Sequence, residues 1–196
     1  MKTLYYYVLI AILSIVSCKS NVKPVSEKTA FAIYKTVARK EIPGSIMEEL
    51  KQTLITIVTD SLSPIIAYVN ADSIITFPKT DRVKFFTTAY PIDKEKTYLA
   101  LVAITTQPVL TNTDIKTTKP KQNSIEIYFN LKGAKKWAEL TMTSIGSMIA
   151  FTIDNRIYTL TSVNGEIRNG VAVINGLENE DMADRISGSI NAGLKN

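Results

Sequence analysis

The clearest pattern of hydrophobic and polar positions lies in the last third of the chain. Residues 124–129, SIEIYF, alternate strictly, which predicts a strand with Ile125, Ile127 and Phe129 on one face. Asn130 is well placed to cap a helix over residues 131–142. Four residues at helical spacing would form the buried face of this helix: Ala134, Trp137, Ala138 and Thr141.

A hairpin and a second helix are predicted next. Residues 148–153 and 156–161 flank Asp154-Asn155, a pair typical of a two-residue hairpin turn. Two Asn-Gly pairs mark further turns before a short strand over residues 171–174. A last helix shows an apolar stripe at Met182, Ala183, Ile186, Ile190 and Leu194. The order β-α-β-β-β-α predicts an α+β fold, with helices packed on one face of an antiparallel sheet.

The N-terminal part of the chain is β-rich. Residues 31–38 fit either a strand or a helix, and the alternation of Phe31, Ile33 and Val37 favours a strand. Ser45 and Glu48 have the spacing of a capping box, which predicts the start of a short helix. Strands are predicted at residues 54–58, 65–69, 82–88 and 98–104. The polar residues 107–122 are predicted to form a connector.

The first eighteen residues predict a location. Residues 4–16 form an apolar run that is too short to span a bilayer but typical of a signal peptide. The run ends Ile-Val-Ser-Cys, which resembles a bacterial lipobox and implies that Cys18 carries the lipid, including acyl chains such as palmitate. An ordinary signal peptide or an uncleaved helix is the alternative. Lys19 is not the aspartate of inner-membrane retention, so we expect the outer membrane.

We therefore divide the chain into four parts. A lipoprotein signal peptide covers residues 1–17, and a polar tether covers residues 18–29. A β-rich region of no recognised family covers residues 30–106, and an α+β subdomain covers residues 107–196.

Composition excludes several kinds of chemistry. The chain has no histidine and one cysteine, so catalysis by Ser-His-Asp or Cys-His groups and zinc sites built on those residues are excluded. The net charge of +5 is scattered, which argues against a nucleic acid partner. No cofactor or metal site is predicted, and paired carboxylates remain the alternative for a hydrolase.

Three groups of residues qualify as candidate sites. An acidic cluster lacks the spacing of a calcium loop and is better explained as the start of a helix: Glu178, Glu180, Asp181 and Asp184. Lysines form either an anion-binding patch or an ordinary solvated face: Lys116, Lys119, Lys121, Lys132, Lys135 and Lys136. Tyr128 and Tyr158 lie either on the outer face of the sheet, as a platform for a peptide partner, or in ordinary sheet packing.

Residues 108–194 resemble the head subdomain of the first periplasmic domain of SecD, a subunit of the protein-export translocase. The shared features are a strand that ends in Phe and a polar residue, a helix with a Gly-Ala pair, and later glycines. They are found here at Phe129, Asn130, Gly133, Ala134, Trp137, Ala138, Thr141, Gly146, Gly170 and Gly176. The glycine expected before Asp114 is replaced by Asn112 and Thr113.

The resemblance implies a periplasmic domain that contacts unfolded polypeptide. SecD also carries transmembrane helices that drive its motion, whereas no apolar run of comparable length follows Cys18 here. We therefore expect a non-enzymatic, lipid-anchored envelope protein that binds extended polypeptide passively. The alternative is an assembly module for one dedicated envelope protein.

Overall fold

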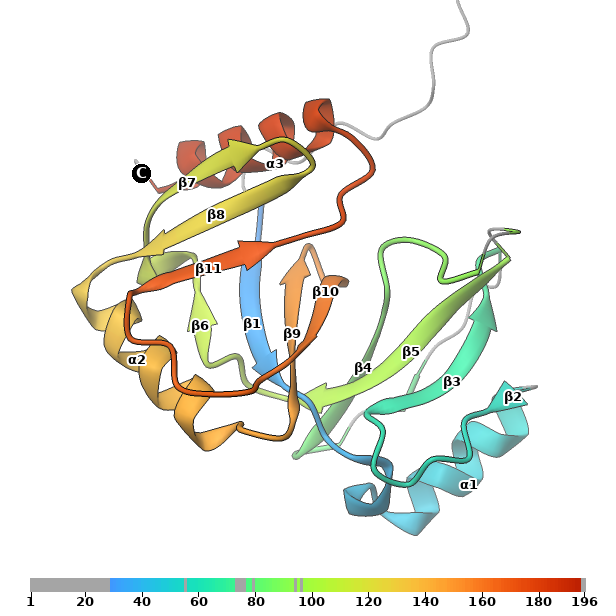
Figure 1. Ribbon diagram of the computed structural model, residues 1–196. Coiled ribbons are helices and arrows are strands. Elements are labelled where there is room, and N and C mark those ends of the chain that lie inside the picture. Colours follow the sequence, from blue (N-terminus) through green and yellow to red (C-terminus); the bar gives the residue numbers. More distant parts are fainter. Residues whose placement is uncertain are drawn as a thin grey trace, which may run out of the picture.

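The computed structural model describes residues 29–54, 56–72, 77–78, 80–93, 95 and 97–194 (Figure 1). Cys18, the expected signal peptide and nearly all of the tether lie outside these residues, so they stay predictions. The described part folds into three antiparallel sheets and three α-helices, which confirms the predicted α+β class. Within these ranges, no helix has both the length and the hydropathy needed to cross a membrane.

Sheet 1 joins strands from the two ends of the chain. In spatial order its strands are β10 (Arg156–Ser162), β9 (Met148–Ile153), β1 (Phe31–Lys35) and β6 (Leu110–Thr111). The strand favoured after residue 30 is confirmed as β1, whose Ala32 pairs with Thr152 on one side and Thr111 on the other. Asp154 and Asn155 both have positive φ, as the predicted turn between β9 and β10 requires.

Sheet 2 contains the strictly alternating strand. It comprises β11 (Val171–Ile174), β8 (Ser124–Phe129) and β7 (Ile115–Lys121) in that spatial order. The three apolar residues of β8 are buried, as the alternation predicts. The prediction of a connector over residues 107–122 is wrong, because this segment forms β6, the short 3-10 helix η2 (Asn112–Asp114) and β7. As an edge strand, β7 can carry lysines toward water and tolerate Pro120.

Sheet 3 is formed by the four strands predicted in the N-terminal part. They are β2 (Thr56–Ile57), β3 (Ile65–Asn70), β5 (Tyr98–Thr105) and β4 (Val83–Thr87) in spatial order. Residues 99–104 of β5 are all buried because both faces are covered. Leu99, Leu101 and Ala103 pack in the core with α1 (Gly44–Thr53). The alternate residues of β5 pack against sheet 1.

The start of α1 differs from the prediction. The helix begins at Gly44, so Pro43 is its N-cap, and no side chain caps it. The Pro43 carbonyl accepts hydrogen bonds from the N–H groups of Ile46 and Met47. The predicted capping box is therefore wrong: Ser45 lies inside the helix, and Glu48 pairs with Lys51 one turn later. A second 3-10 helix, η1 (Arg39–Glu41), precedes α1.

The largest core lies between sheets 1 and 2. It contains Phe31 and Phe151 from sheet 1, Ile127 from sheet 2, and residues of α2 (Leu131–Thr143) and α3 (Glu180–Gly193). In Figure 1 the strands of sheet 2 run at a large angle to β1 and β9, and α3 runs beside β7. The edge strands β10 and β11 both contribute residues to one groove.

Candidate functional site

The two tyrosines singled out from the sequence lie on different sheets. Tyr128 is on β8, where its hydroxyl donates to Glu126 at 2.7 Å and the ammonium of Lys119 lies 5.1 Å from its ring centre. Hydrogen bonding to Glu126 raises the pKa of Tyr128. Tyr158 is on β10 and packs edge-on against Tyr90. The structure thus does not bring the two rings onto one sheet, and a role for either in partner binding stays a prediction.

The charged clusters have local structural explanations. Glu180 and Asp181 lie in the first turn of α3, whose N-cap Asn179 accepts from the N–H of Met182 at 2.9 Å. The described residues contain no group of three or more side chains arranged to hold a metal. Two of the candidate lysines have acidic partners: Lys121 pairs with Glu126 and Lys136 with Asp114.

The two edge strands of sheet 2, β7 and β11, differ in whether a side chain covers their main chain. On β7, the side-chain amide of Asn191 from α3 covers the main chain of Thr118: its oxygen accepts the Thr118 N–H at 2.8 Å, and its nitrogen donates to the Thr118 carbonyl at 2.9 Å. An open strand edge can pair with another chain, and this cap blocks such pairing at Thr118, in the middle of β7. The edge at β11 has no comparable cover among the described residues.

The alternation of hydrogen bonds along β11 shows which of its main-chain N–H and carbonyl groups are free of β8. Phe129 N–H donates to the Gly170 carbonyl at 3.0 Å, so Ala172 and Ile174, two and four residues later, also bond to β8. The main-chain groups of Val171 and Val173 then point away from β8. Asn169 Oδ1 accepts the Val171 N–H at 3.0 Å. The open edge therefore presents the Val171 carbonyl and both main-chain groups of Val173.

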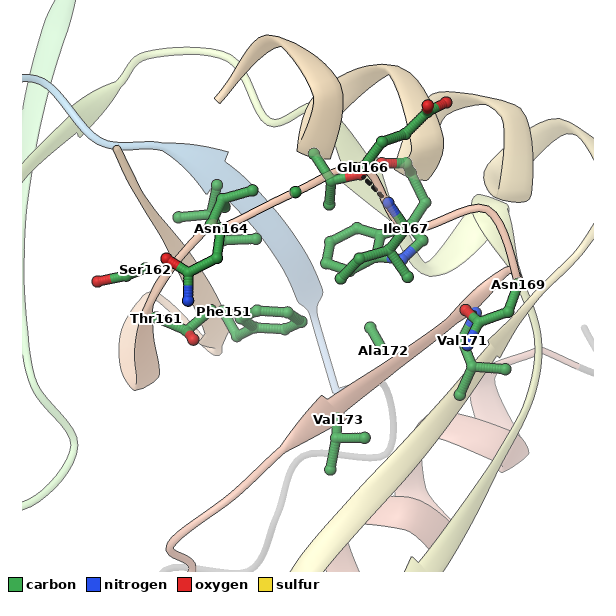
Figure 2. A pocket seen from close by; sticks show the side chains of 15 residues that line it. Phe151, Thr161, Ser162, Asn164, Glu166, Ile167, Asn169, Val171, Ala172 and Val173 are labelled. Atoms are coloured by element: carbon green, nitrogen blue, oxygen red, sulfur yellow. Dashed lines mark hydrogen bonds between the residues drawn. The ribbon is translucent and has the colours of Figure 1, made fainter. Parts of the chain in front are cut away.

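A groove of about 550 Å³ lies beside this edge (Figure 2). Its apolar floor is formed by Trp137 of α2 and Ile149 and Phe151 of β9. One side is formed by the end of β10 and the other by β11, and the connecting loop, residues 163–170, runs over α2. Beyond the end of β11, Thr159 Oγ1 of β10 donates to the Asn175 carbonyl at 3.2 Å.

Polar contacts fix α2, which carries Trp137 of the groove floor. The Asn130 side chain caps the helix by accepting the Gly133 N–H at 2.9 Å, as predicted. Lys136 lies 2.8 Å from Asp114 Oδ1, and that carboxylate is only 1% exposed. Asp114 also accepts the Thr111 N–H at 3.0 Å. These contacts join α2 to the η2 segment and hold its inner face in a fixed position.

Sequence reasoning did not find this groove. The residues that form it come from α2, β9, β10, β11 and a loop, and no motif connects them. The two Asn-Gly pairs and the short strand after them were the available signals, because they indicate a loop that returns beside a brief edge strand.

Comparison with known proteins identifies the family of the domain that contains the groove. A family model described as the P1 head subdomain of SecDF matches residues 85–194, more than half of the chain. The chain belongs to this family. The match begins within β4, earlier than the resemblance noted from residue 108. The P1 head is a periplasmic part of SecDF, so the chain contains a domain associated with protein export.

Individual relatives agree with the family. The chain is 33% identical to protein translocase subunit SecDF of Thermus thermophilus, in a match that covers 45% of this chain and 13% of that protein. It is 30% identical to subunit SecD of Rhodothermus marinus, over 45% of this chain and 14% of that protein. The chain therefore matches only a small part of the length of these curated relatives.

A solved structure supports the fold. It is described as SecDF, a membrane component that enhances protein export, and has a TM-score of 0.50 and 18% identity to the P1 head protein described here. The likeness covers 87% of this chain and 66% of that chain. At this identity the likeness shows the fold alone.

Proposed function

We propose that this P1 head protein is a non-enzymatic, lipid-anchored protein of the cell envelope that binds extended polypeptide in the periplasm. The observation that carries the proposal is the open edge of β11 beside an apolar groove, in a sheet whose other edge is capped by Asn191. Membership in a family associated with protein export supports it.

Strand addition is the binding mode that fits this site. An extended segment lying along β11 receives main-chain hydrogen bonds from the edge, while its alternate side chains enter the groove. The segment is short, because Asn169 already occupies the N–H of Val171 and Thr159 already occupies the carbonyl of Asn175. Because the hydrogen bonds are made by the ligand's main chain and the groove floor is apolar, the site favours extended, uncharged segments and does not require one particular sequence.

A capped peptide, acetyl-Thr-Val-Thr-Val-Thr-amide, tests this function. We expect its addition to ¹⁵N-labelled full chain in detergent to shift the amide resonances of β11, with the resonance of Thr118 on the capped edge as the internal control. A version with N-methylated alternate amides lacks the donors that meet the Val171 and Val173 carbonyls and should not bind. Equal binding of both versions would rule out strand addition.

A proline variant tests the same edge from the protein side. In Val173→Pro the lost N–H is one that points away from β8, so sheet 2 keeps its ladder while the ligand loses its donor. We expect peptide binding to disappear and the fold to remain. Val173→Thr keeps the N–H and the branched shape, so it is the matched control and should bind as the parent does.

The anchor has its own test. The lipobox-like pattern before Cys18 motivates the proposal, and the outer membrane remains its expected location. Cys18→Ala should move the protein from the membrane fraction to the soluble fraction and abolish labelling by radioactive palmitate. Continued membrane association with normal processing would contradict the anchor. Co-purification of one stoichiometric protein with the parent, and no effect of Val173→Pro, would favour the assembly-module alternative.

A further inference from the structure

The outer face of α2 carries large apolar side chains that the described residues leave exposed. Leu131 in the first turn is 82% exposed, Met142 in the last turn is 50% exposed, and Ile145 just after the helix is 55% exposed. Leu131 and Met142 are about three full turns apart, so they lie on the same face. Trp137 and Leu140, on the opposite face, are buried. Exposed apolar side chains that share one face are typical of an interaction surface.

The same outer face is positively charged. Lys132 and Lys135 are exposed between the apolar residues, and neither has an acidic partner in the part of the chain that the structure describes. At the other end of the helix, the ammonium of Lys35 donates to Thr143 Oγ1 at 3.1 Å. Glu139 is the one acidic residue of α2. The face therefore combines apolar side chains with an excess of cations.

The described chain begins beside the N-terminal end of this helix. The Thr29 carbonyl accepts from Asn112 Nδ2 at 3.0 Å, and the neighbouring Thr113 carbonyl accepts from Nδ2 of Asn130, the N-cap of α2, at 2.9 Å. Cys18 lies eleven residues before Thr29, and a chain of this length spans at most about 36–40 Å. A lipid on Cys18 therefore keeps this end of α2 within that distance of the bilayer.

We propose that the outer face of α2 docks on the surface of a bilayer that contains anionic phospholipids. The proposal rests on the lipid anchor of the proposed function and goes further, because it fixes which face of the domain meets the membrane. Apolar side chains flanked by lysines are typical of helices that lie in a bilayer interface. Anionic headgroups supply the negative charge that Lys132 and Lys135 lack.

The other possible occupants fit this face less well. A second copy of the chain would bring like charges together on its own Lys132 and Lys135, which costs free energy. The residues of the docking face, Leu131, Lys132, Lys135, Met142 and Ile145, do not line the groove. Docking on lipid therefore leaves the groove available to polypeptide while holding it beside the membrane.

A dye on α2 tests the docking. Cys18 is the only cysteine and a lipid would block it, so Met142→Cys supplies one reactive thiol. The full chain, purified from membranes, is labelled with a nitrobenzoxadiazole maleimide and reconstituted into vesicles of phosphatidylcholine and phosphatidylglycerol. We expect nitroxide groups on the lipid acyl chains to quench the dye.

Ile92→Cys is the matched control, because Ile92 is 51% exposed. Its N–H donates to the Tyr98 carbonyl at 2.9 Å, where β5 begins on the side of the molecule away from α2 (Figure 1). We expect little quenching there. No quenching at residue 142, or equal quenching at both positions, would overturn the proposal and leave the anchor intact.

Two further outcomes of the labelling separate the anchor from the docking. Labelling of the parent would show that Cys18 is free, which would refute the anchor and the docking with it. A change in emission at residue 142 that grows with protein density, without quenching by lipid, would show that protein covers the face and would also overturn the proposal.

Charge variants test the choice of lipid. In the double variant Lys132→Gln and Lys135→Gln, we expect the ratio of docked to undocked protein to fall about five-fold for each lysine removed. Lys132→Arg with Lys135→Arg keeps both charges, so it is the matched control and should dock as the parent does. Both lysines are exposed, and far-UV circular dichroism checks that each variant is folded. Unchanged quenching in the glutamine variant, or in vesicles of phosphatidylcholine alone, would overturn the role of anionic lipid.

Discussion

Replacing Gly133 by alanine tests how tightly α2 is joined to η2. A Cβ at this position would lie 2.1 Å from the Asp114 carbonyl oxygen and 2.9 Å from Asp114 Cβ. That carbonyl cannot move aside cheaply, because it accepts the Asn130 N–H at 2.9 Å. The substitution therefore forces the helix away from η2 and strains its N-terminal cap.

The magnitude follows from two opposing effects. Alanine is the better helix former by about 1 kcal/mol, while overpacking a buried contact costs about 1–3 kcal/mol and a lost hydrogen bond about 1 kcal/mol more. We expect Gly133→Ala to lower the free energy of unfolding by about 2 kcal/mol. Gly188 in α3 is the matched control, since a Cβ there meets nothing within 4 Å. Gly188→Ala should raise the free energy of unfolding by about 0.5–1 kcal/mol.

Urea unfolding followed by far-UV circular dichroism measures both variants. The midpoints should move in opposite directions while the dependence on urea concentration stays the same. A Gly133→Ala protein as stable as the parent would show that the contact with Asp114 is not close. Loss of stability in both variants would show that the response is general to these helices and not caused by this contact.

Three further substitutions, one of them with a matched control, test contacts elsewhere in the fold. Asn191→Leu should cost about 1–3 kcal/mol by leaving the main chain of Thr118 unpaired, and should increase self-association in light scattering by opening the β7 edge. Lys136→Met should lower the free energy of unfolding by about 1–3 kcal/mol, measured in urea, because it leaves the buried Asp114 carboxylate without its cation. Lys135→Met, on the exposed side of the helix, should change the free energy of unfolding little. Burial, and to a smaller extent nearby Tyr158 and Glu178, raises the pKa of Tyr90 from 10.0 to about 12. The stability that the neutral Tyr90 hydroxyl contributes is therefore fully present below pH 10 and is lost as the pH rises toward 12. Tyr90→Phe should flatten the decline of the unfolding free energy across that window, and an unchanged slope would contradict this assignment.

Local patterns in the sequence were sufficient for some elements. The alternation in residues 124–129, the cap at Asn130 and the Asp154–Asn155 turn each depend on neighbours in the chain, and all three are confirmed. The polar strand β7 was missed because its edge position and its cap at Asn191 are set by tertiary packing. The start of α1 was misplaced because the first acceptor is the backbone carbonyl of Pro43 and not a side chain, so the Ser45 and Glu48 spacing does not mark the helix end.

The candidate site could not be predicted from local sequence patterns, because it too depends on tertiary packing. Whether an edge strand is open depends on what packs beside it, and the valines of β11 look the same in either case. Trp137 appeared from the sequence to be an ordinary core residue of an amphipathic helix. Only the three-dimensional arrangement shows that its ring is buried as predicted while its nitrogen lacks an acceptor.

The position of β1 affects how the chain reaches its folded state. β1 lies inside sheet 1, where it pairs with residues 110–111 of β6 on one side and with residues 149–153 of β9 on the other. Such distant pairing raises contact order and slows folding, because a long loop must close before the contacts form. During synthesis, the pairing of β1 with β9 is possible only once residues 149–153 have been made. Sheet 1 and the core behind the groove are therefore completed late, after most of the chain has been made.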